Sequence, residues 1–219
     1  MLKETYLPNH PDIKIYQNES MIGINTDTML LGEFIEVYKE DTVLDFGTNT
    51  GALLLYASMF SPKKLIGVDI NKEAIELAKI NMEKNNITNY ELICQDILEY
   101  QAEEVDVIIC NPPYFKTEEE NKSENLALNL AKHESSLCLE NLIPAIRRNL
   151  KNYGNLFFLY QTSRMQEVIN KLSKNKFRIK EIKLCYDDNK ELSNVFLLKA
   201  VKGGKMGLIA KKPVIIKHK

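Results

Sequence analysis

The sequence predicts a doubly wound α/β domain built on a mostly parallel sheet. Short apolar runs alternate with helical patterns through the middle of the 219-residue chain, as is typical of parallel strands covered by helices on both faces. The last two strand-like runs follow each other with only a short polar loop between them. We therefore expect an antiparallel pair to close the sheet.

Hydrophobic patterning predicts each element in turn. Before the middle of the chain, strands are expected at 42–46, 64–69, 90–94 and 105–110, and three of these runs are nearly all apolar. Residues 72–84 form an expected helix whose apolar stripe consists of Ala74, Ile75, Ala78 and Met82. The second half is expected to contain a helix at 142–150, a strand at 155–160, a helix at 165–173, and strands at 177–186 and 194–201.

Two segments lie outside this strand–helix repeat: the first 30 residues and the tail from Lys202 to Lys219. No linker-like composition separates either segment from the rest. We therefore expect one domain over residues 1–219, with an N-terminal extension and a basic C-terminal tail.

Charge is distributed unevenly along the chain. Residues 1–145 hold 11 lysines and 25 acidic residues, whereas residues 146–219 hold 18 basic and 5 acidic residues. Six lysines fall within the last 18 residues. This asymmetry fits a surface that binds a polyanion, and it fits a solvated lysine-rich surface equally well.

Composition excludes several classes of protein. No apolar run approaches the roughly 20 residues that span a bilayer, and the first residues lack the apolar stretch of a signal peptide. The cysteines are widely separated, which argues against a zinc site and against a disulfide framework; they are Cys94, Cys110, Cys138 and Cys185. We expect a soluble, cytoplasmic protein with no metal and no membrane partner.

The first motif is the turn from Asp45 to Gly51 (DFGTNTG), between an expected strand and an apolar helix. Ligands of α/β sheets bind at the carboxyl ends of strands, and glycine lets the backbone approach them closely. A dinucleotide fingerprint needs glycine at 47, 49 and 52, but the chain has Asn49 and Ala52 at the last two positions. No lysine follows the turn, so a P-loop is also excluded. An ordinary strand–helix turn is the alternative.

Acidic residues end the next two strands. Asp69 lies 24 residues after Asp45, where a carboxylate can accept hydrogen bonds from both ribose hydroxyls of a nucleoside. Asp96 ends the following strand. Either residue alone fits a helix cap, but their places at successive strand ends favour ligand contacts.

The second motif is Asn111 to Tyr114 (NPPY), which follows the strand at 105–110. The Asn111 side-chain oxygen and the Pro112 carbonyl can accept the two protons of a planar amine, which turns the nitrogen lone pair toward a methyl donor. The prolines restrict the backbone and preorganise these acceptors. Tyr114 offers a ring on which a flat base can stack. The motif predicts methylation of an amine, and a simple proline turn is the alternative.

The two motifs resemble those of class I S-adenosylmethionine-dependent amino-methyltransferases, although Asn49 replaces the middle glycine of their D-x-G-x-G-x-G turn. Segments 22–31, 131–134 and 200–216 resemble the bacterial tRNA(Val) adenine-N6 methyltransferase family. The resemblance implies a seven-stranded Rossmann-like sheet with one antiparallel strand. It also implies S-adenosylmethionine as cofactor and N6-methylation of adenine 37 in a tRNA, with valine tRNA as the expected partner.

The resemblance further implies roles for individual residues. The implied donor contacts are Thr26, Asp27, Asp45, Gly47, Asn49, Gly51, Asp69, Ile70, Asp96, Ile97 and Asn111. The implied catalytic residues are Asn111, Pro112 and Tyr114. The implied substrate contacts are Pro113, Tyr114, Phe115, Lys132, His133, Lys205, Lys211 and Lys212, with further phosphate contacts from Lys202, Arg147, Arg148, Lys174, Lys176 and Arg178. Thr26 and Asp27 can instead cap a helix at 28–37, and the family often has arginine where Lys132 stands.

Other acceptors use the same motif, so three alternatives stay open. Guanine-N2 enzymes for ribosomal RNA commonly carry a second copy of the domain, and glutamine-N5 enzymes for release factors usually carry an N-terminal helical domain. We expect neither addition in this chain. An RNA-binding protein without activity is the third alternative, against which the intact Asp45, Asp69, Asn111 and Tyr114 argue. Monomer and weak homodimer are both open.

Overall fold

The computed structural model describes residues 2–18, 23–101, 103–113 and 138–217. Its first elements are β1 (Leu2–Leu7), β2 (His10–Asn18), α1 (Thr26–Gly32), β3 (Thr42–Phe46), α2 (Ala52–Ser58), β4 (Lys64–Asp69), α3 (Lys72–Lys84), β5 (Tyr90–Cys94) and β6 (Val105–Cys110). The remaining elements are α5 (Leu139–Asn149), β7 (Leu150–Gln161), α6 (Met165–Lys174), β8 (Phe177–Asp187), β9 (Val195–Lys202), β10 (Ile209–Ala210) and β11 (Val214–Ile216). No helix in these ranges is long and apolar enough to cross a membrane.

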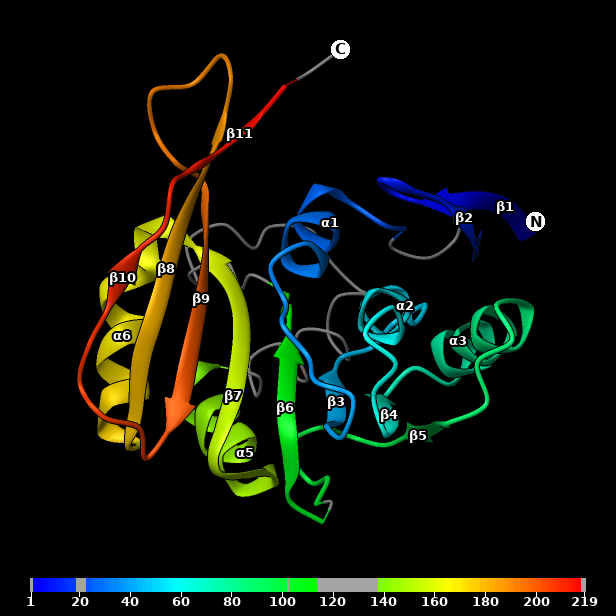
Figure 1. Cartoon of the computed structure of the whole chain (residues 1–219), viewed down its shortest axis with the longest axis horizontal. Helices are drawn as coiled ribbons and strands as arrows, with labels where there is room; N and C mark the ends of the chain where they lie inside the picture. Colours follow the sequence, from blue (N-terminus) through cyan, green and yellow to red (C-terminus); the bar gives the residue numbers. More distant parts are fainter. Residues whose placement is uncertain (1, 19–22, 102, 114–137, 218–219) are drawn as a thin grey trace, which may run out of the picture.

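The central sheet has the core order β5–β4–β3–β6–β7–β9–β8 (Figure 1). β9 is antiparallel to both β7 and β8, and the other neighbours in this core are parallel. The expected seven-stranded arrangement with one antiparallel strand is therefore confirmed. The C-terminal tail extends the sheet, because β10 and β11 both pair in parallel with β8.

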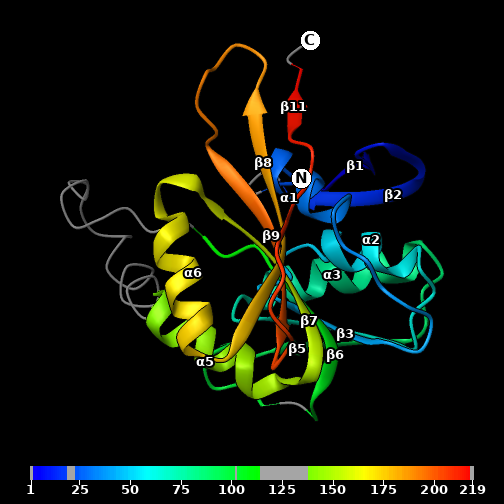
Figure 2. The same ribbon diagram turned by 60° about the vertical axis from the view of Figure 1, so that its left-hand side comes forward.

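Helices cover both faces of the sheet, with α1, α2 and α3 on one face and α5 and α6 on the other (Figures 1 and 2). Successive residues of a strand point to opposite faces, so Phe157 of β7 joins the apolar cluster under α1 and α2, while Phe158 joins the cluster under α5 and α6. Both phenylalanines are fully buried. Burial on both faces explains why these strands are continuous apolar runs in the sequence.

The six strands β3 to β8 run in the same direction and end at one edge of the sheet, which we call the carboxyl edge. It is the upper edge in Figure 1. The opposite edge is called the amino edge. The four strands β3, β4, β5 and β6 and the helix α3 have the predicted bounds. The helix expected at 142–150 begins earlier, at Leu139, and the strand expected at 155–160 begins at Leu150 with a register shift in its pairing to β6.

The helix expected at 28–37 is wrong in both bounds. α1 begins at Thr26, and its cap is Asn25, whose side-chain oxygen accepts a hydrogen bond from the Thr28 amide at 2.9 Å. Thr26 and Asp27 lie in the first turn of α1, so neither residue caps it. The N-terminal extension adds an element that was not predicted, the antiparallel hairpin β1–β2.

Candidate active site

The turn between β3 and α2, residues 47–51, has an open backbone, and we call it the donor turn. Gly47 and Gly51 both have a φ of 78°, and Asn49 has a φ of 48°, so asparagine takes the positive φ expected where the family has its middle glycine. The amides of Gly47 and Thr48 donate to the Val68 carbonyl at 2.9 and 3.0 Å, which fixes the turn to the end of β4. A Cβ built at Gly47 would meet no described atom within 4 Å. A ligand can therefore approach the backbone at this point.

Asp69 connects two loops at the carboxyl edge. One carboxylate oxygen accepts a hydrogen bond from the Asn49 amide and the other accepts one from the Asn71 amide, each at 2.9 Å. The cap of α3 is Asn71, whose side chain accepts from the Glu73 amide at 2.9 Å. Asp69 is therefore not the cap of that helix, and its carboxylate is held beside the donor turn.

Asp45 is the buried acid of the site. Its side chain is fully buried, and neither carboxylate oxygen has a hydrogen-bond partner in the part of the chain that the structure describes. Burial raises the pKa of Asp45 to about 7, the nearby Thr48 hydroxyl lowers it, and the negative charge of Asp69 raises it further. An unpartnered buried carboxylate is costly, and a cationic ligand group would satisfy it. The amino group of S-adenosylmethionine is such a group, so Asp45 and the open backbone at Gly47 fit this donor.

The other expected donor contacts differ in exposure. The Asp96 carboxylate accepts a hydrogen bond from the Leu98 amide at 2.8 Å, which forms a tight turn after β5. Ile97 is only 8% exposed and packs in the apolar core, whereas Ile70 is 50% exposed at the end of β4. Burial raises the pKa of the Cys185 thiol on β8, the positive charge of Lys183 lowers it, and the negative charge of the nearby Asp27 on α1 raises it further.

Asn111 and Pro112 follow β6 directly at the carboxyl edge. In the sheet register Cys110 pairs with Phe46, so the next residues, Asn111 and Gly47, leave neighbouring strands that are about 5 Å apart. Asn111 is half-buried, Pro112 is buried and Pro113 is exposed. The structure thus brings Asn111 and Pro112 close to the donor turn. The expected contacts Tyr114, Phe115, Lys132 and His133 lie outside the described residues.

The residue of α3 that supports the donor turn, Asn81, was not predicted. The side-chain amide of Asn81 on α3 donates to the Thr50 carbonyl at 2.8 Å, and Asn81 is fully buried. The buried face of α3 contains Leu77 and Asn81 in addition to Ala74, Ala78 and Met82, whereas Ile75 of the expected stripe is only half-buried. A polar residue at helical spacing among Ala78 and Met82 was the available signal.

The expected phosphate contacts fall into two groups. Lys205, Lys211 and Lys212 are exposed on the tail, and the Lys211 ammonium lies 3.2 Å from the Glu181 carboxylate. Lys202 is buried instead, and its ammonium donates to the Arg147 carbonyl at 3.0 Å and to the Glu104 carboxylate at 3.2 Å. Lys202 therefore stabilises the fold through these buried hydrogen bonds, and the expectation that it binds RNA is not supported.

The remaining basic residues lie at the amino edge, away from Asn111. α5 and α6 end immediately before β7 and β8 begin, which places Arg147, Arg148, Lys174, Lys176 and Arg178 there. The Arg148 guanidinium donates to the carbonyls of Leu98 and Tyr100 at 2.7 and 2.9 Å. These five residues therefore lie at the opposite edge of the sheet from Asn111. We do not expect them to contact phosphates close to a base that is bound at the carboxyl edge.

Comparison with known proteins identifies the family. Residues 38–201 match the family model described as a methyltransferase domain. A tRNA1(Val) (adenine(37)-N6)-methyltransferase of Pseudoalteromonas translucida is 33% identical over 67% of this chain, and the chain spans 62% of that protein's length. A putative protein N5-glutamine methyltransferase of Methanocaldococcus jannaschii is 31% identical over 78% of this chain and 83% of its own length.

The fold is shared with solved structures at lower identity. The crystal structure of a predicted O-methyltransferase from Agrobacterium tumefaciens is 18% identical, with a TM-score of 0.67 and 88% of each chain covered. This likeness concerns the fold alone. The chain therefore belongs to the methyltransferase-domain family, and its fold is that of the class I S-adenosylmethionine-dependent methyltransferases.

Proposed function

We propose that this protein acts in the cytoplasm and transfers a methyl group from S-adenosylmethionine to N6 of adenine 37 in a tRNA. Valine tRNA is the first candidate. The observation that carries the proposal is the position of Asn111 and Pro112, which leave β6 directly beside the open turn at Gly47. A methyl donor and an amine acceptor can meet there. The names of curated relatives, such as the one from Pseudoalteromonas translucida, support an adenine of tRNA as the acceptor.

The donor would be held along the carboxyl edge. S-adenosylmethionine supplies a methyl group carried on a positively charged sulfur atom. In our proposal Asp45 pairs with its amino group, Asp69 accepts from the ribose hydroxyls, and Asp96 lies by the adenine. The backbone from Gly47 to Gly51, including Asn49, lies against the donor, and Ile70 and Ile97 flank its base. Thr26 and Asp27 lie in the first turn of α1, which begins near the same edge in Figure 1, and we propose that they also contact the donor.

The acceptor adenine would enter from the exposed side of Pro113. The Asn111 side-chain oxygen and the Pro112 carbonyl accept hydrogen bonds from the two N6 protons, which aims the nitrogen lone pair at the methyl group. After transfer the methylated nitrogen loses a proton to water, so no general base is needed before attack. We propose that Tyr114 and Phe115 stack on the base, and that Lys132 and His133 line the substrate side.

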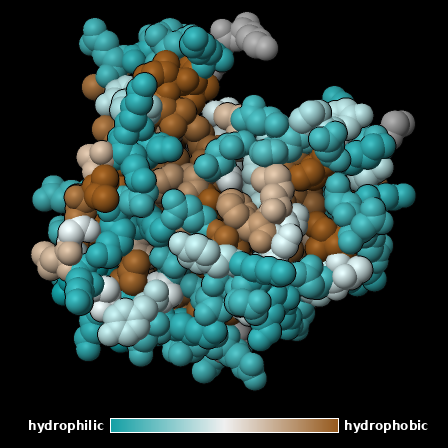
Figure 3. Space-filling view, viewed as in Figure 1, coloured by the Kyte–Doolittle hydropathy of each residue, from teal (hydrophilic) through white to brown (hydrophobic). Residues whose placement is uncertain are grey.

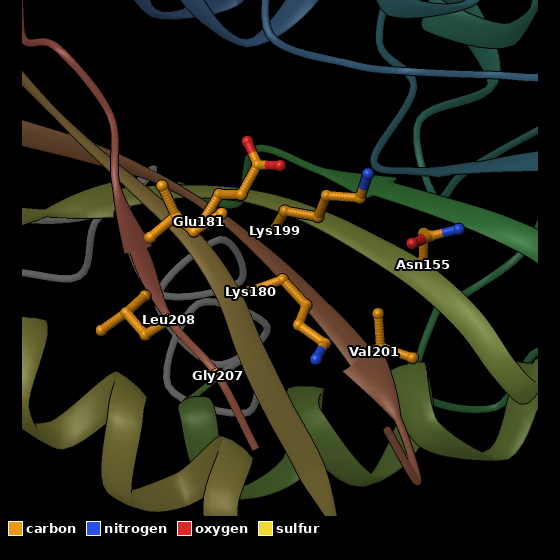
Figure 4. A pocket seen from close by; sticks show the side chains of 8 residues that line it. Asn155, Lys180, Glu181, Lys199, Val201, Gly207 and Leu208 are labelled. Atoms are coloured by element: carbon orange, nitrogen blue, oxygen red, sulfur yellow. The ribbon is translucent and has the colours of Figure 1, made fainter. Parts of the chain in front are cut away.

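A groove beside the tail is lined by charges of both signs, from Lys180, Lys199 and Glu181, and the Lys199 ammonium is paired with the Glu36 carboxylate. The groove has a volume of about 460 Å³ and lies between the tail and the open face of β7, β9 and β8 (Figure 4). Lys180 and Lys199 extend along it, and the Lys180 ammonium donates to the carbonyl of Lys205 at 2.8 Å. Figure 3 shows hydrophilic side chains over most of this face, with hydrophobic ones gathered over the upper parts of β8 and β9.

The tail runs from the amino edge toward the carboxyl edge. Lys205 lies at its beginning after β9, and Lys211 donates its amide to the Ile182 carbonyl of β8 at 2.8 Å. β11 then pairs with the last residues of β8. Lys205, Lys211 and Lys212 thus lie along a path that runs toward the carboxyl edge, the edge at which Asn111 follows β6. We propose that they contact phosphates of the tRNA.

A glutamine side chain of a protein is the second candidate acceptor, favoured by the name of the Methanocaldococcus jannaschii relative, and a translation release factor is the protein that we propose to test. The two are separated by supplying methyl-labelled S-adenosylmethionine with either valine tRNA transcript or a release factor. We expect label in the transcript, and none in a matched transcript with guanine at position 37. Label in the release factor and none in either transcript would overturn the proposal.

A further inference from the structure

The N-terminal hairpin lies outside residues 38–201, which the methyltransferase-domain model matches. We infer that this hairpin is nevertheless part of the donor site, because Asn81 joins it to the donor turn and acts as a positioning residue for donor binding. The inference rests on the proposed function only in requiring that S-adenosylmethionine binds at that turn.

One side-chain amide makes the connection. The Asn81 oxygen accepts a hydrogen bond from the Tyr16 amide at 2.7 Å, and its nitrogen donates to the Tyr16 carbonyl at 3.1 Å. The same nitrogen donates to the Thr50 carbonyl at 2.8 Å. Asn81 is fully buried, so water cannot replace these bonds. The backbone of β2 and the backbone of the donor turn therefore depend on one amide group.

Asn85, one helical turn further along α3, holds the hairpin in the same way without reaching the turn. Its oxygen accepts from the Lys14 amide at 3.2 Å, and its nitrogen donates to the Lys14 carbonyl at 2.7 Å. The spacing of four residues on α3 thus matches the spacing of two on β2, and the two amides pair with alternate residues as a neighbouring strand would. Asn85 provides a matched control for Asn81.

The hairpin is also packed against the helices beside the turn, as Figure 1 shows. The Tyr56 hydroxyl of α2 donates to the Pro8 carbonyl at 2.9 Å. The rings of His10 and Tyr56 pack edge to face, with their centroids 5.4 Å apart. Leu7 and Ile15 are buried in the same apolar cluster as α1 and α2. The hairpin is therefore held rigidly against the elements that carry the donor turn.

Thr50 lies between Asn49 and Gly51, which both have a positive φ, so its carbonyl direction depends on the shape of the turn. A hydrogen bond that orients this carbonyl favours the shape in which Gly47 is open. Because such coupling is reciprocal, donor binding at the turn must also favour docking of β2 at Tyr16. This linkage is what distinguishes a positioning role from a purely structural one.

The test compares Asn81→Asp with Asn85→Asp in the full chain. Asn81→Asp keeps the shape of the side chain but replaces the donating nitrogen with an oxygen that faces the carbonyls of Thr50 and Tyr16. By calorimetry with S-adenosylmethionine and no RNA, we expect its dissociation constant to rise about tenfold. For Asn85→Asp we expect a change of less than about twofold, although urea denaturation should show that both variants lose stability.

A second measurement uses the wild-type protein, so it does not depend on the folding of a variant. Saturation with S-adenosylmethionine should slow hydrogen exchange of the Tyr16 amide, and leave unchanged the Asp188 amide, which bonds to Ile216 on the far side of the sheet. Unchanged exchange at Tyr16 with the donor bound, or equal donor affinity in the two variants, would overturn the inference alone. Failure of the wild type to bind the donor would overturn the proposed function as well.

Discussion

Asp45→Asn tests the electrostatics of the donor site most sharply, because stability and function should change in opposite directions. Burial raises the pKa of Asp45 from its ordinary 3.8 to about 7, so the folded state binds the proton more tightly than the unfolded state. The contribution of Asp45 to stability is therefore greatest at low pH and is lost as the pH rises through about 7. Above that pH, the folded protein carries a buried negative charge that has no hydrogen-bond partner among the described residues.

The magnitude follows from linkage. With a folded pKa of about 7, the unfolding free energy of the wild type falls by about 2 kcal/mol as the pH rises from about 5.5 to about 8. The variant does not lose this free energy, because asparagine does not titrate. We therefore expect Asp45→Asn to gain about 2 kcal/mol over wild type between these two pH values, measured by urea denaturation. It should also bind S-adenosylmethionine at least about tenfold more weakly, because the ion pair with the amino group is lost.

Asp106→Asn is the matched control at the amino edge. The Asp106 carboxylate accepts from the Thr42 amide at 3.0 Å and lies 2.7 Å from the Lys151 ammonium. Its removal should lower stability at about pH 8 and leave donor affinity unchanged. Parallel stability curves of Asp45→Asn and wild type across this pH range would refute the reasoning about Asp45.

Three further predictions concern the acceptor, the RNA surface and the core. Asn111→Ala should lower the rate of methyl transfer at least about a hundredfold in single-turnover assays, because it removes an acceptor for the N6 protons. The dissociation constant of the donor should rise far less. Equal losses in rate and in donor affinity would contradict this role. Lys212→Gln should weaken tRNA binding in filter assays, most strongly at low salt, whereas Lys174→Gln at the amino edge should not. Lys202→Met should lower the unfolding free energy by about 2 kcal/mol without changing tRNA affinity, because the carbonyls of Arg147 and Leu150 lose their donor.

The sequence predicted best where local chemistry decides the structure. β3 and β4 are buried on both faces and end at a turn that glycine and aspartate dictate, so their bounds and the places of Asp45 and Asp69 could be predicted. β10 and β11 could not, because strands of two and three residues form only where β8 offers an unpaired edge.

Lys202 was misjudged, and Asn81 was missed, for a related reason. In the sequence Lys202 is one more lysine of a basic tail, and Asn81 is a polar interruption of an apolar stripe. Their roles come from backbone groups distant in sequence, the carbonyls of Arg147 and Leu150 for Lys202, and Thr50 and Tyr16 for Asn81. Such contacts depend on tertiary structure and leave no periodic signal.

The most direct test of the account is to identify the methylated nucleoside. Valine tRNA transcript is incubated with the protein and S-adenosylmethionine, cut into fragments by ribonuclease, and analysed by mass spectrometry, with the Asn111→Ala protein as control. We predict N6-methyladenosine in the fragment that contains position 37, and none with the control protein. A methyl group on guanine, at another position, or equally abundant with Asn111→Ala would contradict the assignment of Asn111 and Pro112 as the groups that hold the N6 amine.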